Sequence, residues 1–139
     1  MIEMRACIDV GNLDRAIEFY TRAFELKVGR RLGAAWVELR GASCAIDLLC
    51  NAEGSSAYPG TDEERNYRRH WTPVHLDFVV EDVESAVRRA EAVGAKLDRA
   101  IQEQPYGRMA NMADPFGNGF CLLEFRGRGY DEMLASDNA

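Results

Sequence analysis

The chain has 139 residues, of which 47% are hydrophobic and 29% are charged, and its formal net charge is −6. This length fits one globular domain or two half-domains that fold together. The acidic balance argues against a nucleic-acid partner, because phosphate binding needs a basic surface. No apolar run approaches the ~20 residues of a membrane-spanning helix, so we expect no membrane partner.

The N-terminal residues alternate polar and apolar side chains, which is unlike a signal peptide. The four cysteines show no CxxC spacing, and most of them lie in apolar, strand-like runs. We therefore expect reduced thiols and a cytoplasmic location.

The first fifty residues predict a strand, a helix and further strands. Residues 2–10 alternate with a period of two, which is typical of a strand with one buried face. Asn12 is a plausible N-cap for a helix whose apolar positions continue to about Glu25. Residues 29–40 predict a strand, and after a Gly-Ala-Ser turn residues 44–50 predict another, which carries Asp47.

After an irregular connector, the second half predicts the same order of elements. A strand with His75 and Asp77 on its polar face leads to a helix that Asp82 caps and Gly94 ends. Three further strands are expected at 96–102, 107–113 and 120–125, with a strong turn signal at 114–119.

Residues 5–25 and 75–95 follow the same pattern at an offset of 70 residues, which predicts two copies of one supersecondary unit. Paired units usually enclose a cleft, and a cleft is where a ligand is expected. We predict a single domain over 1–139, divided into module one (2–50), a connector (51–72), module two (73–126) and a polar surface tail (127–139).

Two stretches resemble a known superfamily. Residues 10–26, VGNLDRAIEFYTRAFEL, and residues 114–125, DPFGNGFCLLEF, are similar to sequences of the vicinal oxygen chelate superfamily, which includes glyoxalase I, bleomycin resistance proteins and extradiol dioxygenases. The resemblance implies an α+β fold in which two βαβββ modules form a cup-shaped mixed sheet. It also implies a homodimer and a small-molecule ligand as partner.

In metal-dependent members of this superfamily, four side chains hold one divalent ion. By position these sites correspond here to Arg5, Asp47, His75 and Cys121. Asp47, His75 and Cys121 have chemistry suited to a divalent metal. Arg5 does not, because a guanidinium stays protonated and has no lone pair to give. An Arg5–Asp47 ion pair would remove a second ligand as well, so we expect no complete metal site and no resident cofactor.

The expected function is metal-free binding of a small organic molecule in the cup. The candidate binding residues are Arg5, Asp47, His75, Asp77, Cys121 and Arg108. Arg5 with His75 would clamp a carboxylate or phosphate, whereas Asp9, Asp47 and Asp77 would hold an amine.

Three alternatives remain open at this point. The first is a metal-dependent lyase, isomerase or dioxygenase, in which Asp47, His75 and Cys121 hold a Lewis-acidic ion. The second is metal-free acid–base catalysis by His75, the best candidate for a catalytic residue. The third is a self-satisfied polar network with no ligand.

Overall fold

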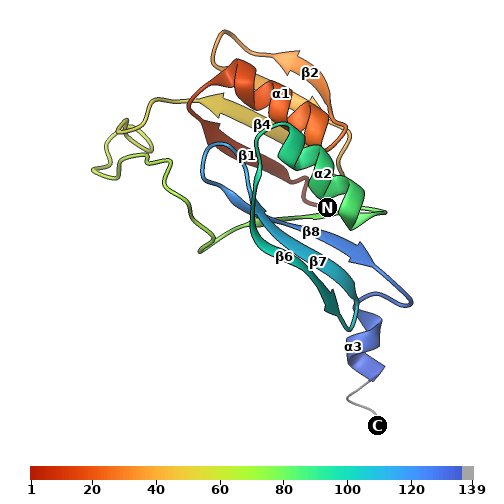
Figure 1. The fold of residues 1–139 in the computed structure, drawn as a ribbon. Helices are drawn as coiled ribbons and strands as arrows, with labels where there is room; N and C mark the ends of the chain where they lie inside the picture. The colour runs from red at the N-terminus through yellow and green to blue at the C-terminus, as the bar shows by residue number, and fades with distance from the viewer. Residues whose placement is uncertain (136–139) are drawn as a thin grey trace. The chain divides into compact units, whose positions relative to one another are not determined.

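The fold was analysed in a computed structural model that describes residues 1–135. The chain forms two compact units, the first from Met1 to Arg68 and the second beginning at Arg69. The first unit contains β1 (Arg5–Val10), α1 (Leu13–Ala23), β2 (Lys27–Arg31), β3 (Trp36–Arg40) and β4 (Ala45–Cys50) (Figure 1). The second contains β5 (Leu76–Val79), α2 (Val83–Ala92), β6 (Lys96–Gln104), β7 (Gly107–Ala113), β8 (Gly119–Phe125) and α3 (Asp131–Ala135).

The two units share one topology. Each has a four-stranded mixed sheet, ordered β1-β4-β3-β2 in the first unit and β5-β8-β7-β6 in the second. The first strand pairs in parallel with the last strand of its unit, and the other pairs are antiparallel. This repetition confirms both the predicted internal repeat and the predicted α+β fold of two βαβββ units.

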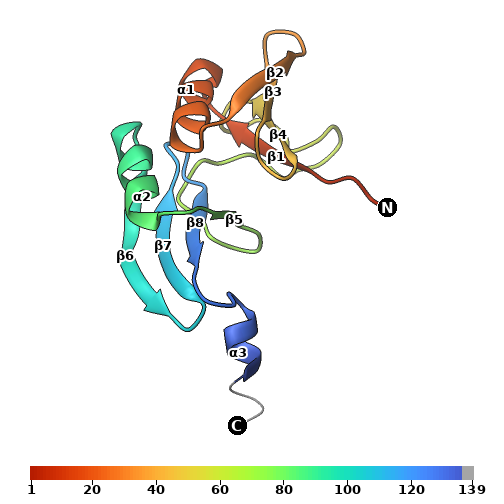
Figure 2. The same cartoon turned by 90° about the vertical axis from the view of Figure 1, so that its right-hand side faces the viewer.

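One helix lies along one face of each sheet (Figures 1 and 2). Both helices begin at the predicted caps, where the Asn12 side chain accepts a hydrogen bond from the backbone N–H of Arg15 and Asp82 accepts one from that of Glu84. The helices bury their apolar stripes against the sheets, at Ala16, Phe19, Tyr20 and Ala23 in α1 and at Val83, Ala86, Val87 and Ala90 in α2. We call the other face of each sheet its open face.

The strand boundaries differ from the prediction in the first unit. Strand β1 begins only at Arg5, and Ile2 and Met4 are exposed rather than buried. The predicted strand over 29–40 is two antiparallel strands, β2 and β3, because the chain reverses at Gly33, whose φ of 70° lies in the left-handed region. The period-two pattern continues on both sides of this turn and therefore hides it.

The predicted connector, 51–72, contains no regular strand or helix and is divided between the units at Arg68. The part of the connector that belongs to the first unit is hydrogen-bonded to β1. Arg65 Nε donates to Asp9 at 2.9 Å, and Asn51 Nδ2 donates to the same carboxylate at 3.0 Å. The predicted polar tail includes the short helix α3, and its residues 136–139 lie outside the described part of the chain. None of the helices described is long and apolar enough to cross a membrane.

Candidate functional site

Strand register places one row of polar side chains across the open face of each sheet. In the first unit Cys7 pairs with Asp47, and Asp47 pairs with Glu38. In the second unit Asp77 pairs with Cys121, and Cys121 pairs with Asn111. Paired residues point to the same face of a sheet, as do residues two apart on a strand, so Arg5 and His75 join these rows. We call Arg5, Cys7, Glu38 and Asp47 the first polar group, and His75, Asp77, Asn111 and Cys121 the second polar group.

Arg5 is locked within the first polar group. Its Nε donates to Asp47 Oδ2 at 2.8 Å and its Nη2 donates to Asp47 Oδ1 at 2.7 Å, which is a bidentate ion pair. The same Nη2 also donates to Glu38 Oε2 at 2.6 Å. Asp47 is 1% exposed, so its carboxylate is buried and both of its oxygens are covered by one guanidinium.

Glu38 is the second buried carboxylate of this group, and three arginines surround it. Arg30 donates through Nε at 3.1 Å and through Nη2 at 2.7 Å, and Arg40 donates through Nε at 3.0 Å, in addition to Arg5. A Cβ at Gly29 would lie 2.8 Å from Glu38 Oε1, closer than real contacts allow. The sequence therefore needs a residue without a side chain at Gly29 to leave room for this carboxylate.

These contacts fix the charge states of the first polar group. Hydrogen bonds from Arg30 and then Arg5 hold the pKa of Glu38 well below its usual range. Hydrogen bonding from Arg5 lowers the pKa of Asp47 in the same way, and the pKa of Arg5 is raised by its bonds to Asp47 and Glu38. Burial, followed by the charge of Asp47, raises the pKa of the Cys7 thiol. The group is thus an ionised, internally paired network with a protonated thiol beside it.

The second polar group is less tightly closed. His75 Nε2 lies 3.2 Å from Asp77 Oδ1, and both side chains are exposed. Asn111 Nδ2 donates to Cys121 Sγ at 3.4 Å, whereas the buried Oδ1 of Asn111 has no hydrogen-bond partner among residues 1–135. Burial, with the adjacent charge of Asp77, raises the pKa of the Cys121 thiol to about 12. The exposed histidine and its carboxylate partner are therefore available to an added molecule, whereas the unpartnered oxygen of Asn111 is buried.

Aromatic side chains stand next to the second polar group. The Trp71 ring meets the His75 ring edge-on with centroids 5.5 Å apart, and Trp71 Nε1 donates to Asp98 at 3.0 Å. Tyr106 packs against Tyr130 at 5.0 Å. Burial raises the pKa of Tyr106, and the nearby charges of Tyr130, Cys121 and Asp77 add to this shift. Rings with this placement offer flat contact surfaces to a planar ligand.

The predicted site residues are thus divided between the two units. Arg5 and Asp47 meet in the first unit, and His75, Asp77 and Cys121 meet in the second. Arg108 does not join the second polar group, because it pairs in register with Glu124 on the helix-covered face and donates to Glu84 of α2 at 2.8 Å.

Three members of the polar groups, Cys7, Glu38 and Asn111, were not among the site residues predicted from the sequence. The signal for Glu38 was present, since Trp36, Glu38 and Arg40 alternate with the buried Val37 and Leu39. A charged residue in the middle of such a strand indicates a polar open face. Asn111 lies in a strand of mixed small and apolar residues, where nothing marks it.

The four-ligand metal centre of the superfamily does not fit these residues. Arg5 stands where an imidazole would be needed and has no lone pair to offer. It also occupies both carboxylate oxygens of Asp47, the second first-unit position. The second unit does bring His75, Asp77 and Cys121 together, with one possible ligand atom from each lying within 4.8 Å of the others. A thiol pKa of about 12 opposes the thiolate form that metal binding requires.

Comparison with known proteins identifies the family. A glyoxalase-like domain model matches residues 5–123, so the chain belongs to the glyoxalase-like domain family, within the vicinal oxygen chelate superfamily. The chain is similar to the uncharacterized protein Mb0911c of Mycobacterium bovis, with 30% identity over 117 residues, 77% of this chain and 72% of the relative. It is also 38% identical over 59 residues to the anthracycline biosynthesis protein DnrV of Streptomyces peucetius. That match covers 42% of this chain and only 20% of DnrV.

Solved structures agree on the fold. The fosfomycin resistance protein FosX of Listeria monocytogenes aligns with a TM-score of 0.73 at 16% identity, over 98% of this chain and 99% of that chain. TnmS3, an antibiotic-binding protein from Streptomyces sp. CB03234, aligns with a TM-score of 0.65 at 19% identity, over 91% and 97%. Identities this low show a common fold and leave the ligand to be argued from the site itself.

Proposed function

We propose that this protein binds a small organic molecule and does so without a resident catalytic metal. The observation that carries the proposal is the bidentate Arg5–Asp47 pair, because it places a cation at one superfamily ligand position and covers the other ligand of the first unit. A network of paired charges of this kind is suited to positioning and recognition, since its carboxylates stay ionised and its arginines stay protonated near neutral pH.

We place the ligand-binding surface at the second polar group. The exposed His75 and Asp77 side chains offer polar contacts to a hydroxyl or amine of a ligand. Trp71 and Tyr106 supply aromatic surface beside them. A flat, ring-containing molecule that bears hydroxyl or amine groups fits these features best. The likeness to an antibiotic-binding protein and to an anthracycline biosynthesis protein supports this ligand class.

Metal analysis of the protein, purified without chelator, tests the metal-free part of the proposal. We expect less than a tenth of an equivalent of zinc, nickel, manganese or iron per chain. One equivalent of tightly bound metal would contradict the proposal. The contradiction would be firm if a chelator removed the metal, lowered the thermal stability, and re-added metal restored it.

A thermal-shift screen of hydroxylated polycyclic aromatic compounds, followed by calorimetric titration of the best one, tests the ligand surface. His75→Gln should weaken binding about fivefold or more, because it removes the exposed imidazole that pairs with Asp77 in the proposed ligand surface. His70→Gln is the matched control, since His70 is the second of the chain's two histidines and is not part of the second polar group. Equal affinities of both variants and the wild type would place the ligand elsewhere.

A metal-dependent lyase, isomerase or dioxygenase remains the second candidate function. The clustering of His75, Asp77 and Cys121 favours it, because nitrogen, oxygen and sulfur donors within 4.8 Å of one another suit zinc. In this case the second unit would hold the metal, and its carboxylate ligand would be Asp77 instead of Asp47, which was expected from the sequence. A His75→Ala variant with unchanged metal content and unchanged turnover would exclude this candidate.

The homodimer and the cytoplasmic location expected from the sequence stay predictions. Light scattering of the purified chain and fractionation of cells that express it would test them.

A further inference from the structure

The indole of Trp71 is seated on a glycine at the start of β8. A Cβ at Gly119 would lie 2.5 Å from Cδ2 and 2.6 Å from Cε2 of the indole, closer than real contacts allow. These two atoms form the bond shared by the two indole rings, so the glycine meets a face of the indole and not its rim. Because Gly119 lies two residues before Cys121 on β8, the indole lies on the open face of the second sheet, beside the second polar group.

Further contacts fix the orientation of this indole. Its Nε1 donates to Asp98 Oδ2 at 3.0 Å, and Asp98 Oδ1 in turn accepts a hydrogen bond from Arg69. The preceding residue, His70, is joined to the backbone before β8 on both sides. Its N–H donates to the Gly117 carbonyl, and its carbonyl accepts from the Gly119 N–H, each at 2.9 Å. The indole is therefore held in one orientation by contacts within the second unit.

The indole keeps surface for a ligand. Trp71 is partly exposed, and since Gly119 covers one face of the ring, the exposed part is the opposite face and the rim. The His75 ring meets the indole at an interplanar angle of 64°, so it stands beside the indole and does not stack flat on it. A ring that is fixed in advance loses little conformational freedom when a planar molecule stacks on it.

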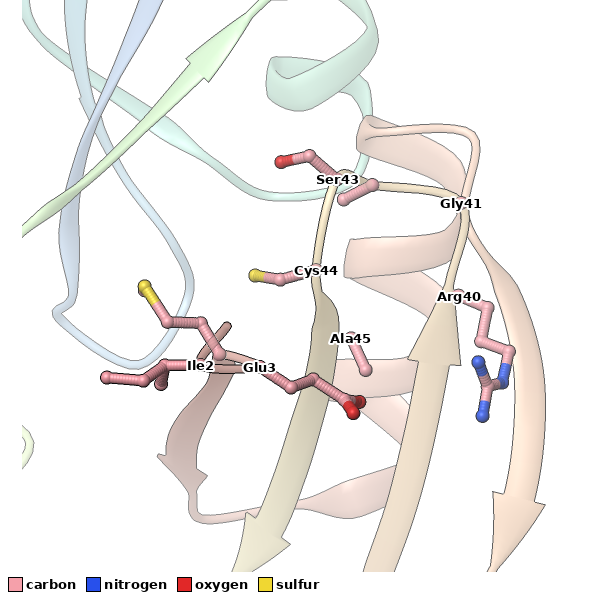
Figure 3. Close-up of a pocket in the computed structure, with 9 residues that line it drawn as sticks. Ile2, Glu3, Arg40, Gly41, Ser43, Cys44 and Ala45 are labelled. Carbon is pink, nitrogen blue, oxygen red and sulfur yellow. The ribbon is translucent and has the colours of Figure 1, made fainter.

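The hollow in the first unit lacks such a ring. It measures about 550 Å³, and Figure 3 shows it beside the start of β4, with Glu3 and Ser43 among its lining residues. The described residues that line it, 2–4 and 40–45, include no aromatic side chain. A planar molecule would find room there but no fixed ring on which to stack, so this hollow provides a control.

We propose that Trp71 is the specificity-determining residue of the ligand surface, and that Asp98 and Gly119 are positioning residues that orient its indole. This inference rests on the proposed function, because it takes the ligand surface to lie at the second polar group. It adds the rule by which that surface selects its ligand. A planar, fused-ring aromatic compound stacks on the indole while its hydroxyl or amine groups reach His75 and Asp77, whereas a saturated ring with the same polar groups gains no stacking contact.

The chain has two tryptophans, which allows the contact to be measured directly. Trp36→Phe leaves Trp71 as the only indole, and the probe is 1,4-dihydroxyanthraquinone, with 1,4-cyclohexanediol as its saturated counterpart. We expect the anthraquinone to quench the fluorescence of Trp36→Phe in a saturable way. Trp71→Leu should weaken its binding about tenfold by calorimetry, because the stacking surface is lost. The diol should bind to neither variant, and Ser43→Leu, which fills the hollow of the first unit, should bind the anthraquinone as the wild type does.

The positioning role of Asp98 is tested by readouts that a merely structural role would not move. Asp98→Ala frees the indole N–H, so the fluorescence anisotropy of Trp71 in the Trp36→Phe background should fall and the anthraquinone should bind about threefold more weakly. Asp98→Asn keeps an acceptor for the indole and should restore both values. Glu91→Ala removes a negative charge from the exposed surface of α2 and should change neither. The Asp98 variants keep the test decisive if Trp71→Leu does not fold.

Three results would overturn the inference while the proposed function stands. The first is a Trp71→Leu variant that binds the anthraquinone as tightly as the wild type. The second is an Asp98→Ala variant that loses thermal stability but keeps both its anisotropy and its affinity. The third is weaker binding in Ser43→Leu, which would place the probe in the hollow. A wild type that binds no planar compound contradicts the proposed function itself, and the inference falls with it.

Discussion

The thiol of Cys121 should react far more slowly in the folded protein than an ordinary thiol. Burial and the charge of Asp77 raise its pKa from 9.0 to about 12, which lowers the thiolate fraction at neutral pH about 1000-fold. A more basic thiolate is a better nucleophile, and a Brønsted coefficient of about 0.4–0.5 returns roughly 20-fold of that loss. The net expectation is a rate about 50-fold below normal, before any steric hindrance from a side chain that is 4% exposed.

The assay is the reaction of the native protein with an aromatic disulfide reagent at neutral pH, in which the released thiolate is followed by absorbance. Four thiols should react in urea, and a slow phase should be present only under native conditions. Cys121→Ala identifies that phase by removing it. Asp77→Asn should accelerate the phase without making it normal, because burial remains the larger cause of the raised pKa.

Two results would refute this reasoning. One is a native protein in which Cys121 reacts at the rate measured in urea. The other is a slow phase whose amplitude is unchanged in Cys121→Ala. The same assay bears on the metal alternative, because a zinc ion bound to His75, Asp77 and Cys121 would need the thiolate and would release a proton as it binds. Added zinc that neither protects Cys121 nor acidifies the solution speaks against such a site.

Stability should also fall as the pH rises above 9.0, because the thiol of Cys121 then ionises in the unfolded chain but stays protonated in the folded protein. Denaturant titrations should show that the wild type loses about 1.4 kcal/mol of unfolding free energy per pH unit relative to Cys121→Ala. Arg5→Met should bring the pKa of Asp47 back toward its ordinary value. Because that pKa is lowered in the folded state, the wild type should be more stable at neutral pH and should lose this advantage as the pH falls below about 4, as acid unfolding will show. Gly107→Ala should cost about 3 kcal/mol, since φ is 145° there and a Cβ would lie 1.9 Å from the Glu124 carbonyl oxygen; an unchanged urea midpoint would contradict this. Asp114→Ala should cost about 2 kcal/mol by thermal unfolding, because the buried carboxylate accepts from the backbone N–H groups of residues 116 and 118.

The local signals in the sequence were sufficient for the elements and for the repeat. Asn12 and Asp82 cap helices where their side chains can reach backbone N–H groups three and two residues on, which is a property of neighbouring residues alone. The spacing of apolar residues likewise reports which side of a helix or strand is buried. The turn at Gly33 was missed because a tight reversal between two strands need not interrupt their alternation.

The polar groups depended on long-range pairing. Arg5 meets Asp47 42 residues away and Glu38 33 residues away, because β4 inserts between β1 and β3 in the sheet. The resemblance to a superfamily identified Arg5 and Asp47 as corresponding site positions, but only the register of the four-stranded sheet brought Glu38, Arg30 and Arg40 into the same network.

The sequence by itself determined the family, the βαβββ repeat and the residue types on each strand, because these follow from periodicity and from matching motifs. The tertiary structure decided which of those residues are satisfied and which are not. It covers the oxygens of Asp47 with Arg5, and it leaves the buried Oδ1 of Asn111 without a partner among the described residues. The physical reason is that hydrogen bonds and ion pairs act over about 3 Å, a distance set by strand register and not by separation along the chain.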